Sequence, residues 1–144
     1  MGRASDEARN RSGGSQGVRR RRNVIEAKEK ALAAAVAAQN IKGQNLTIID
    51  LSGVCSYTDY LVIVTAYSDR QTHAIGDAIA DELKSKGQRP LAREGRGAWI
   101  LIDFGDVIVH VFHEDARAFY DLDKLWADSP RVPVPPPESV AAAS

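Results

Sequence analysis

The chain has 144 residues and a formal net charge of zero, and 44% of its residues are hydrophobic. This length allows one domain with short flanking segments, and the composition suffices for a buried core. No run approaches the roughly 18 consecutive apolar residues of a membrane-spanning helix, and the N-terminus lacks the apolar segment of a signal peptide. Cys55 is the only cysteine, which excludes a disulfide framework and favours a reducing compartment. We therefore predict a cytoplasmic protein with no membrane partner, and an organelle matrix is the alternative location.

The charges are unevenly distributed along the chain. Residues 1–23 contain seven arginines against two acids, whereas residues 24–128 contain sixteen acids against eleven lysines and arginines. Most of the acidic excess lies in 98–128, where seven acids accompany only Arg117 and Lys124. An acidic domain is repelled by phosphate backbones and attracted to basic protein surfaces. The charge therefore favours a protein partner over naked nucleic acid, although a solvated acidic face without a partner accounts for it equally well.

The N-terminal part divides into a basic arm and the start of a folded domain. Residues 1–22 are rich in Arg, Ser and Gly and are predicted to be disordered. The ordered domain is predicted to span 23–128. Asn23 suits an N-cap, and an alanine-rich helix is predicted over 24–39. The apolar side chains near one face of this helix are Ile25, Leu32 and Val36.

Two strands and a helix are predicted next. The strands cover 46–51 and 60–66, and the second is continuously apolar, as expected of a strand buried on both faces. Ser68 and Gln71 form a capping box, in which the Ser68 hydroxyl accepts from the Gln71 amide and the Gln71 side chain reaches back to the Ser68 amide. The helix that they open ends at Gly87. Its apolar stripe consists of Ile75, Ile79 and Leu83.

The C-terminal part begins with a loop at Arg93–Gly97, preceded by a short extended piece at 89–92. A hairpin is predicted from strands 99–103 and 107–112, joined by a turn at Phe104-Gly105-Asp106. A helix then begins at Glu114 and ends before Ser129-Pro130. Its apolar stripe consists of Phe119, Leu122, Leu125 and Trp126. The segment 129–144 is predicted to be a Pro-rich, disordered tail.

These elements follow the order α-β-β-α-β-β-α. They predict a single mixed β-sheet with flanking helices, α/β or α+β by class.

Phosphate-transfer patterns fail on spacing. Gly53–Asp59 contains residue types found in the phosphate-binding turn of nucleotidyltransferases, but their spacing differs. Asp121 and Asp123 lie two residues apart in a predicted helix, where their side chains diverge too far to share Mg²⁺. Asp103–Asp106 spells a kinase motif, but no glycine-rich loop precedes it and the chain is too short for a kinase domain. A solvated helix face is the simpler explanation of Asp121 and Asp123, and a hairpin turn is the simpler explanation of Asp103–Asp106.

Histidine and cysteine patterns are equally incomplete. His110 and His113 lack a third ligand for a metal ion, and Cys55 lacks a base near it in the sequence. A structural histidine and a small buried thiol are the simpler interpretations. We therefore predict no catalytic residue, no metal site, no cofactor and no enzymatic activity.

The remaining candidate is an interaction surface on the hairpin. The period of two along a strand places Trp99, Leu101 and Asp103 on one face and Ile100 with Ile102 on the other. If helices cover only one face, the first set presents an aromatic and an aliphatic anchor beside a carboxylate, a mixture typical of protein interfaces. The alternative is that helices cover both faces and that Trp99 belongs to the core.

The chain from about Ala27 to Pro130 resembles the ribosomal silencing factor family, also called the Iojap family. The resemblance rests on several segments taken together: Asp50-Leu51-Ser52, Thr58-Asp59-Tyr60, Ser68-Asp69-Arg70-Gln71, Arg89-Pro90-Leu91, Glu94-Gly95, Trp99–Phe112 and Arg117–Trp126. The loop before Trp99 is shorter than is usual in the family, and both tails lie outside the family pattern.

The resemblance implies a nucleotidyltransferase-like fold without catalytic carboxylates. It also implies binding to the large ribosomal subunit through ribosomal protein fourteen, which blocks subunit association and represses translation when nutrients are limiting. On this basis Trp99 is the predicted anchor of the partner-binding surface. The other predicted contact residues are Leu101, Asp103, Asp106 and His110.

Three alternatives remain beside this prediction. The first is a role in large-subunit assembly, and the second is a cryptic nucleotidyltransferase. In the third, the Arg19–Arg22 cluster contacts ribosomal RNA weakly. The free protein is either a monomer or a homodimer.

Overall fold

A computed structural model describes residues 25–136, so the predicted basic arm over 1–22 lies outside the described residues. The helices in this part are α2 (Ala27–Asn40), α3 (Asp69–Ser85), α4 (Glu114–Tyr120) and α5 (Leu122–Leu125). The strands are β1 (Gln44–Asp50), β2 (Tyr60–Ala66), β3 (Ala92–Arg96), β4 (Trp99–Asp103), β5 (Val107–His113) and β6 (Arg131–Val132). They form one mixed sheet in the order β3-β4-β5-β2-β1-β6. The predicted fold class is therefore confirmed. None of the helices within 25–136 is long and apolar enough to cross a membrane.

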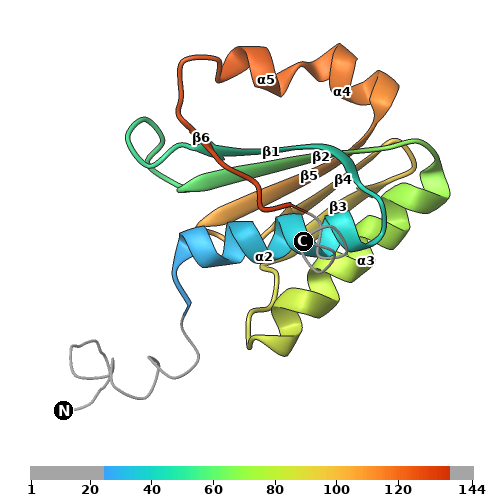
Figure 1. Cartoon of the computed structure of the whole chain (residues 1–144), viewed down its shortest axis with the longest axis horizontal. Helices are drawn as coiled ribbons and strands as arrows, with labels where there is room; N and C mark the ends of the chain where they lie inside the picture. The colour runs from blue at the N-terminus through green and yellow to red at the C-terminus, as the bar shows by residue number, and fades with distance from the viewer. Residues whose placement is uncertain (1–24, 137–144) are drawn as a thin grey trace.

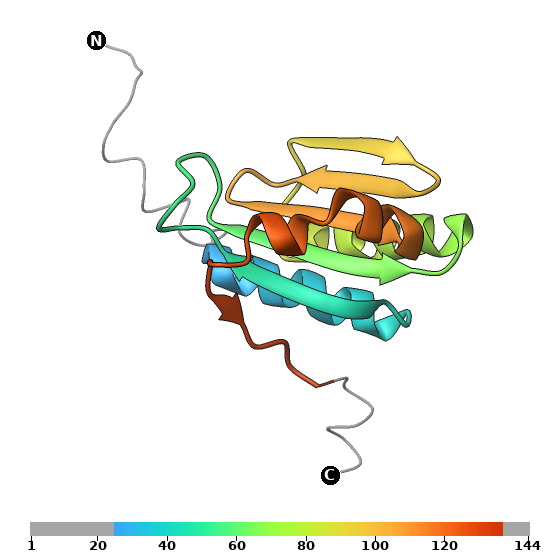
Figure 2. The same cartoon turned by 90° about the horizontal axis from the view of Figure 1, so that it is seen from above.

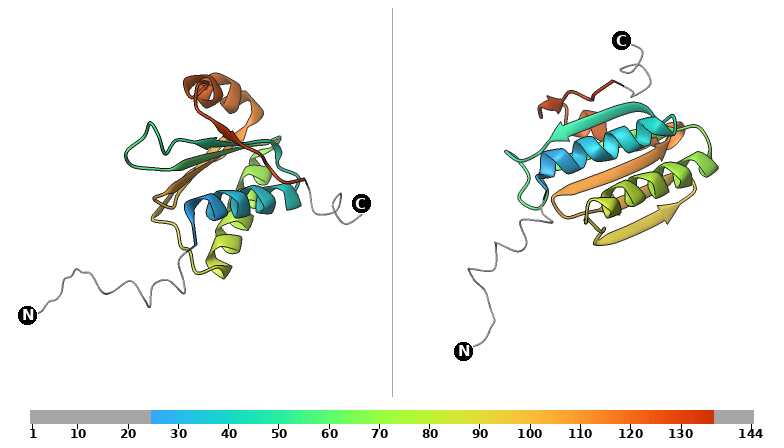
Figure 3. Two further views of the ribbon diagram at one scale, coloured as in Figure 1. Left: turned by 60° about the vertical axis from the view of Figure 1, so that its left-hand side comes forward. Right: turned by 60° about the horizontal axis from the view of Figure 1, so that its bottom comes forward.

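The helices lie on both faces of the sheet. Figure 1 shows α2 and α3 on one face and α4 with α5 on the other, and the right-hand view of Figure 3 shows α2 and α3 side by side across the strands. The middle of the sheet is the parallel pair β2–β5. β2 has its predicted bounds, and every residue from Leu61 to Ala66 is buried. Because helices cover both of its faces, this strand is apolar throughout instead of alternating.

The start of α2 differs from its prediction. The helix begins at Ala27 with Glu26 as its N-cap, so the prediction of Asn23 in that role is wrong. The Glu29 carboxylate accepts a hydrogen bond from the Glu26 amide at 3.1 Å. Carboxylates in the first turn also suit the positive end of the helix dipole.

The buried face of α2 consists of alanines instead of larger side chains. Its buried residues are Ala31, Ala34, Ala35, Ala37 and Ala38. Ile25, Leu32 and Val36 are only partly buried, although Leu32 packs against the main core, so these larger side chains do not form the fully buried face. Methyl side chains allow α2 to approach both the sheet and α3 closely without leaving voids, and this close packing decides which face is buried.

The second predicted helix, α3, is confirmed with one change at its cap. The Ser68 hydroxyl accepts from the Gln71 amide at 3.0 Å as predicted. The Gln71 side chain, however, accepts from the amide of Tyr67 at 2.8 Å, not from that of Ser68. The stripe residues Ile75, Ile79 and Leu83 are fully buried.

A strand replaces the predicted loop at Arg93–Gly97. β3 (Ala92–Arg96) pairs antiparallel with β4 along its whole length, so the loop prediction is wrong. Gly95 adopts a φ of 88° there, and a Cβ atom added to it would lie 2.2 Å from the carbonyl oxygen of Trp99. The glycine therefore serves a close backbone approach within a strand. The β4–β5 hairpin has its predicted turn, and β5 extends one residue further, to His113.

The predicted C-terminal helix is broken into two. Asp121 adopts a left-handed conformation, with φ of 48° and ψ of 52°, between α4 and α5. Because of this break the predicted stripe is only half correct. Leu122 and Trp126 pack on a small second core, whereas Phe119 and Leu125 are 81% and 67% exposed.

Part of the predicted disordered tail is ordered. β6 pairs antiparallel with β1, joining Val132 to Ile48 and Arg131 to Ile49. Val132 and Val134 pack against the main core. The predicted domain boundary at 128 therefore falls before β6 (Arg131–Val132), which forms one edge of the sheet. Residues 137–144 lie outside the described range.

Candidate functional site

The candidate site lies on the sheet face that carries α4 and α5, beyond the area that these helices cover. In Figure 2, α4 and α5 lie over the middle of the sheet, and β3 and β4 lie to one side of them. Along β4, Ile100 and Ile102 are fully buried, whereas Trp99, Leu101 and Asp103 are partly exposed. The predicted division of these side chains between two faces is confirmed. We call the surface formed by Trp99, Leu101, Asp103 and Glu94 the open face.

Trp99 is held within a group of rings. Its indole stacks on Phe112, its partner across the β4–β5 ladder, with 5.2 Å between ring centroids. Tyr120 at the end of α4 lies 4.6 Å from the same indole. Phe112 is fully buried and Tyr120 is 48% exposed, so the group runs from the second core to the surface. Trp99 is therefore a fixed, half-buried ring, and neither a free surface side chain nor a residue of the main core.

His110 lies beside Trp99 on the same face. Its Nδ1 accepts a hydrogen bond from the indole Nε1–H at 3.0 Å, and the two ring centroids are 5.7 Å apart. The residue is only 8% exposed, so it offers little surface of its own to a partner. Burial lowers the pKa of His110 from 6.5 to about 4, which keeps the imidazole neutral near pH 7 and able to accept.

Leu101 and Glu94 surround a small hollow next to Trp99. Glu94 is the ladder partner of Leu101, and the two line a pocket of about 150 Å³ together with Gly95 and Trp99. Its wall is apolar on β4 and carries a carboxylate on β3. Arg96, the ladder partner of Trp99, is exposed at the far end of the same strand. The hollow can accept one apolar side chain with a basic group beside it.

The structure separates the two predicted carboxylates. Asp103 lies on the open face, and its Oδ1 accepts from the Gly105 amide at 2.7 Å. Asp106 instead forms an ion pair with Lys30 of α2 at 2.8 Å, on the opposite side of the sheet. Four of the five predicted contact residues thus share one face, and Asp106 does not join them.

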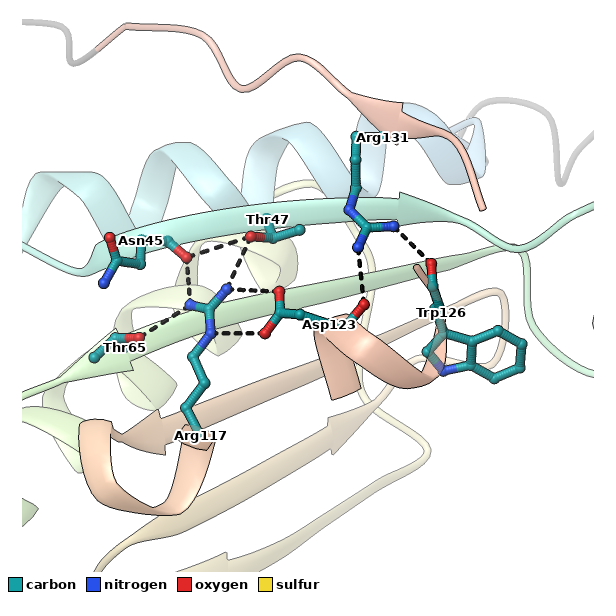
Figure 4. Close-up of polar contacts among 7 residues, drawn as sticks. All are labelled: Asn45, Thr47, Thr65, Arg117, Asp123, Trp126 and Arg131. Carbon is teal, nitrogen blue, oxygen red and sulfur yellow. Dashed lines mark hydrogen bonds and ion pairs between the residues drawn. The ribbon is translucent and has the colours of Figure 1, made fainter. Parts of the chain in front are cut away.

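A partly buried arginine, Arg117, connects α4 and α5 to the sheet, and Figure 4 shows its contacts. Arg117 donates to both carboxylate oxygens of Asp123, at 3.1 and 3.0 Å. It also donates to the Thr65 and Thr47 hydroxyls, each at 2.9 Å, and to the Asn45 carbonyl. One guanidinium therefore ties the turn between the two helices to β1 and β2, and this keeps Tyr120 against Trp99.

The partner carboxylate of Arg117 is ionised in this arrangement. Burial alone would raise the pKa of Asp123, but the hydrogen bonds and the positive charge of Arg117 outweigh burial and lower it. Arg131 donates to three backbone carbonyls around α5, those of Asp123, Trp126 and Ser129. Carbonyls at a helix end lack partners within the helix, and a basic side chain can satisfy them.

Comparisons with known proteins give the same family at the level of sequence and of structure. A family model described as "Ribosomal silencing factor during starvation" matches residues 24–144. The chain belongs to this family. A ribosomal silencing factor of Bacillus subtilis is 38% identical over 67% of this chain and 84% of its own length. The chloroplastic protein Iojap of maize is 30% identical over 73% of this chain and 46% of its own length. A crystal structure of a Chromobacterium violaceum protein aligns with a TM-score of 0.70 at 33% identity, covering 72% of this chain and 88% of the other.

Asp121 and Asp123 are the two carboxylates whose sequence letters suggested a Mg²⁺ site. Asp121 lies between α4 and α5 and not inside a helix as predicted, and the Asp123 carboxylate is bound to Arg117. No group of three or more His, Cys, Asp or Glu side chains suited to a metal ion occurs among residues 25–136. Cys55 is partly buried against the second core.

Sequence reasoning missed several residues that shape the site of this silencing factor. The pairing of Trp99 with Phe112 requires a register centred between Gly105 and Asp106, where the Phe104 amide donates to the Val107 carbonyl. Counting from the predicted three-residue turn would have paired Trp99 with Val111 instead. Arg117 had a signal, because it is one of two basic residues among seven acids in 98–128. Tyr120 had none, since its contact with Trp99 depends on the break at Asp121.

Proposed function

We propose that this protein binds the large ribosomal subunit through the open face, keeps the small subunit from joining, and so represses translation when nutrients are scarce. The proposed partner is ribosomal protein fourteen. The observation that carries the proposal is a half-buried tryptophan, fixed among other rings, on an uncovered part of the sheet in a chain that belongs to the ribosomal silencing factor family. A preformed aromatic anchor beside a small hollow is the usual centre of a protein interface. In this proposal the protein acts in the cytoplasm by binding alone, without catalysis or a cofactor.

The decisive test is sedimentation with purified ribosomal subunits. We expect the parent protein to travel with the large subunit only, and Trp99→Ala to lose this co-sedimentation because the anchor is gone. Tyr57→Ala is the matched control, since Tyr57 is 75% exposed in the loop between β1 and β2 and should behave like the parent. If Trp99→Ala also unfolds at a much lower temperature, Leu101→Asp provides a second variant on the open face. Co-sedimentation of both open-face variants at the parent level would refute this surface.

Charge on the open face should assist the encounter with a basic partner. Glu94 is exposed and lines the hollow next to Leu101, so we expect Glu94→Lys to weaken binding about three- to tenfold at low salt, mainly through slower association. Asp103→Asn should cost less, because the amide oxygen can still accept from the Gly105 amide. Surface plasmon resonance at two salt concentrations measures both effects. An association rate that changes neither with salt concentration nor with Glu94→Lys would contradict electrostatic steering.

A further inference from the structure

Trp99 has a single polar atom, and the structure gives that atom a partner inside the protein. The indole Nε1–H points to Nδ1 of His110 at 3.0 Å, between residues that are diagonal neighbours on adjacent strands. The aromatic contacts of Trp99 fix the plane of the indole. They distinguish less well between the two orientations that differ by a 180° rotation about the Cβ–Cγ bond, which we call the two flips. The hydrogen bond distinguishes them, because only one flip brings Nε1 to His110.

The acceptor that this hydrogen bond needs is available near neutral pH. An imidazole can accept at Nδ1 only when it is neutral and carries its proton on Nε2. Burial, with a pKa of about 4, keeps His110 in its neutral state. The same burial leaves 8% of the residue exposed, so His110 acts on a partner mainly through the residue that it holds.

Building on the proposed docking to the ribosome, we propose that His110 is a positioning residue that fixes the indole of Trp99 in one flip and so presets the edge that the partner meets. A preset anchor binds more tightly because less side-chain freedom is lost on association. A flipped or mobile indole would still fill the space over Phe112, but it would present a different edge to the hollow at Glu94 and Leu101. The role differs from contact with the partner and from packing alone.

Two substitutions separate the hydrogen bond from the ring. His110→Phe keeps a ring of similar shape on Phe112 and Trp99 but has no acceptor. His110→Asn loses the ring, but its Oδ1 occupies the place of Nδ1 relative to Cβ and can accept from the indole. If packing alone matters, Phe should be the better replacement, whereas a positioning role makes Asn the better one.

The experiment combines binding with a direct view of the hydrogen bond. We expect His110→Phe to bind the large subunit about tenfold more weakly than the parent, with a melting temperature close to the parent value. His110→Asn should recover most of the affinity even though it melts at a lower temperature. In ¹⁵N-¹H spectra, the Trp99 indole resonance should move upfield and exchange faster in His110→Phe but not in His110→Asn. The Trp126 indole is the internal control.

The outcomes separate this proposal from the docking on which it rests. Loss of binding in Trp99→Ala combined with parent-level binding in His110→Phe would overturn the positioning role and leave the docking surface intact. Equal weakening in the Phe and Asn variants would also overturn it, because the acceptor would then be irrelevant. Parent-level binding in both Trp99→Ala and His110→Phe would overturn the docking surface and the positioning role together.

Discussion

Replacing Arg117 with leucine should lower the free energy of unfolding by about 3 kcal/mol, the largest effect that we expect from a single substitution outside the main core. The Arg117 side chain is 14% exposed, and it binds the Asp123 side chain, which is 34% exposed. Removing one partner of such a pair strands the other charge, although solvent at Asp123 reduces the full cost of a buried pair. The Thr65 hydroxyl, in a residue only 1% exposed, also loses its donor. Urea unfolding followed by circular dichroism measures the change.

Arg117→Lys and Arg89→Leu are the matched variants for this prediction. A lysine keeps the charge, but its compact ammonium cannot span Asp123 and both threonines, so we expect an intermediate loss of about 1–2 kcal/mol. Arg89 is exposed, and Arg89→Leu should change the free energy of unfolding by less than about 0.5 kcal/mol. Equal stability of the parent and Arg117→Leu would show that the network does not hold α4 and α5 in place.

The sequence predicted the elements that depend on local patterns. The continuous apolar run of β2, the Ser68 cap and the stripe of α3 each act within a few residues, and each was found where expected. The division of β4 into a buried and an open face also follows from strand geometry alone. These predictions succeed because the burial of each residue is set by its neighbours in the sequence.

The errors occurred where tertiary contacts outweigh local preference. Arg93–Gly97 contains charges and glycines that favour a loop, but the hairpin partner β4 supplies the hydrogen bonds that make it a strand. The apolar pattern of the predicted helix continues beyond Asp121, but the helix itself is interrupted there by a left-handed residue. Beyond this break, Asp123 forms its ion pair with Arg117. Ala31 and the other alanines of α2 are more deeply buried than Leu32, because closeness to the sheet, and not side-chain size, decides which residues are buried. None of these three outcomes is visible in local periodicity.

The candidate site divides in the same way. Trp99, Leu101 and Asp103 were placed on one face by periodicity, and the structure confirms that placement. Asp106 was assigned to the same surface because it lies in the turn next to Asp103. Its carboxylate instead pairs with Lys30 of α2, on the other side of the sheet. The burial of His110 likewise depends on its neighbours across the sheet and on the ring of Trp99. Residue type predicted the surface, and only the packing shows which residues reach it.

Deleting residues 130–144 should destabilise the fold by about 3 kcal/mol. The deletion removes Val132 and Val134 from the main core, and each partly buried valine contributes about 1 kcal/mol. It also removes the Pro130 carbonyl, which accepts from the Asp50 amide at 2.8 Å, and the Pro135 carbonyl, which accepts from the Gln39 side chain at 2.7 Å. The exposed edge of β1 should promote self-association. Urea unfolding and analytical ultracentrifugation measure the two effects.

Two further variants show which part of the segment matters. Deleting only residues 137–144 leaves β6 and both valines in place, so we expect the parent stability and oligomeric state. Arg131→Ala in the full chain removes the hydrogen bonds to the carbonyls around α5 but leaves the core unchanged, and should cost less than about 1 kcal/mol. If Arg131→Ala destabilises as much as the long deletion, the segment acts by capping α5. If it does not, the segment acts by closing the edge of the sheet, because burying Val132 and Val134 and pairing with β1 then account for the difference.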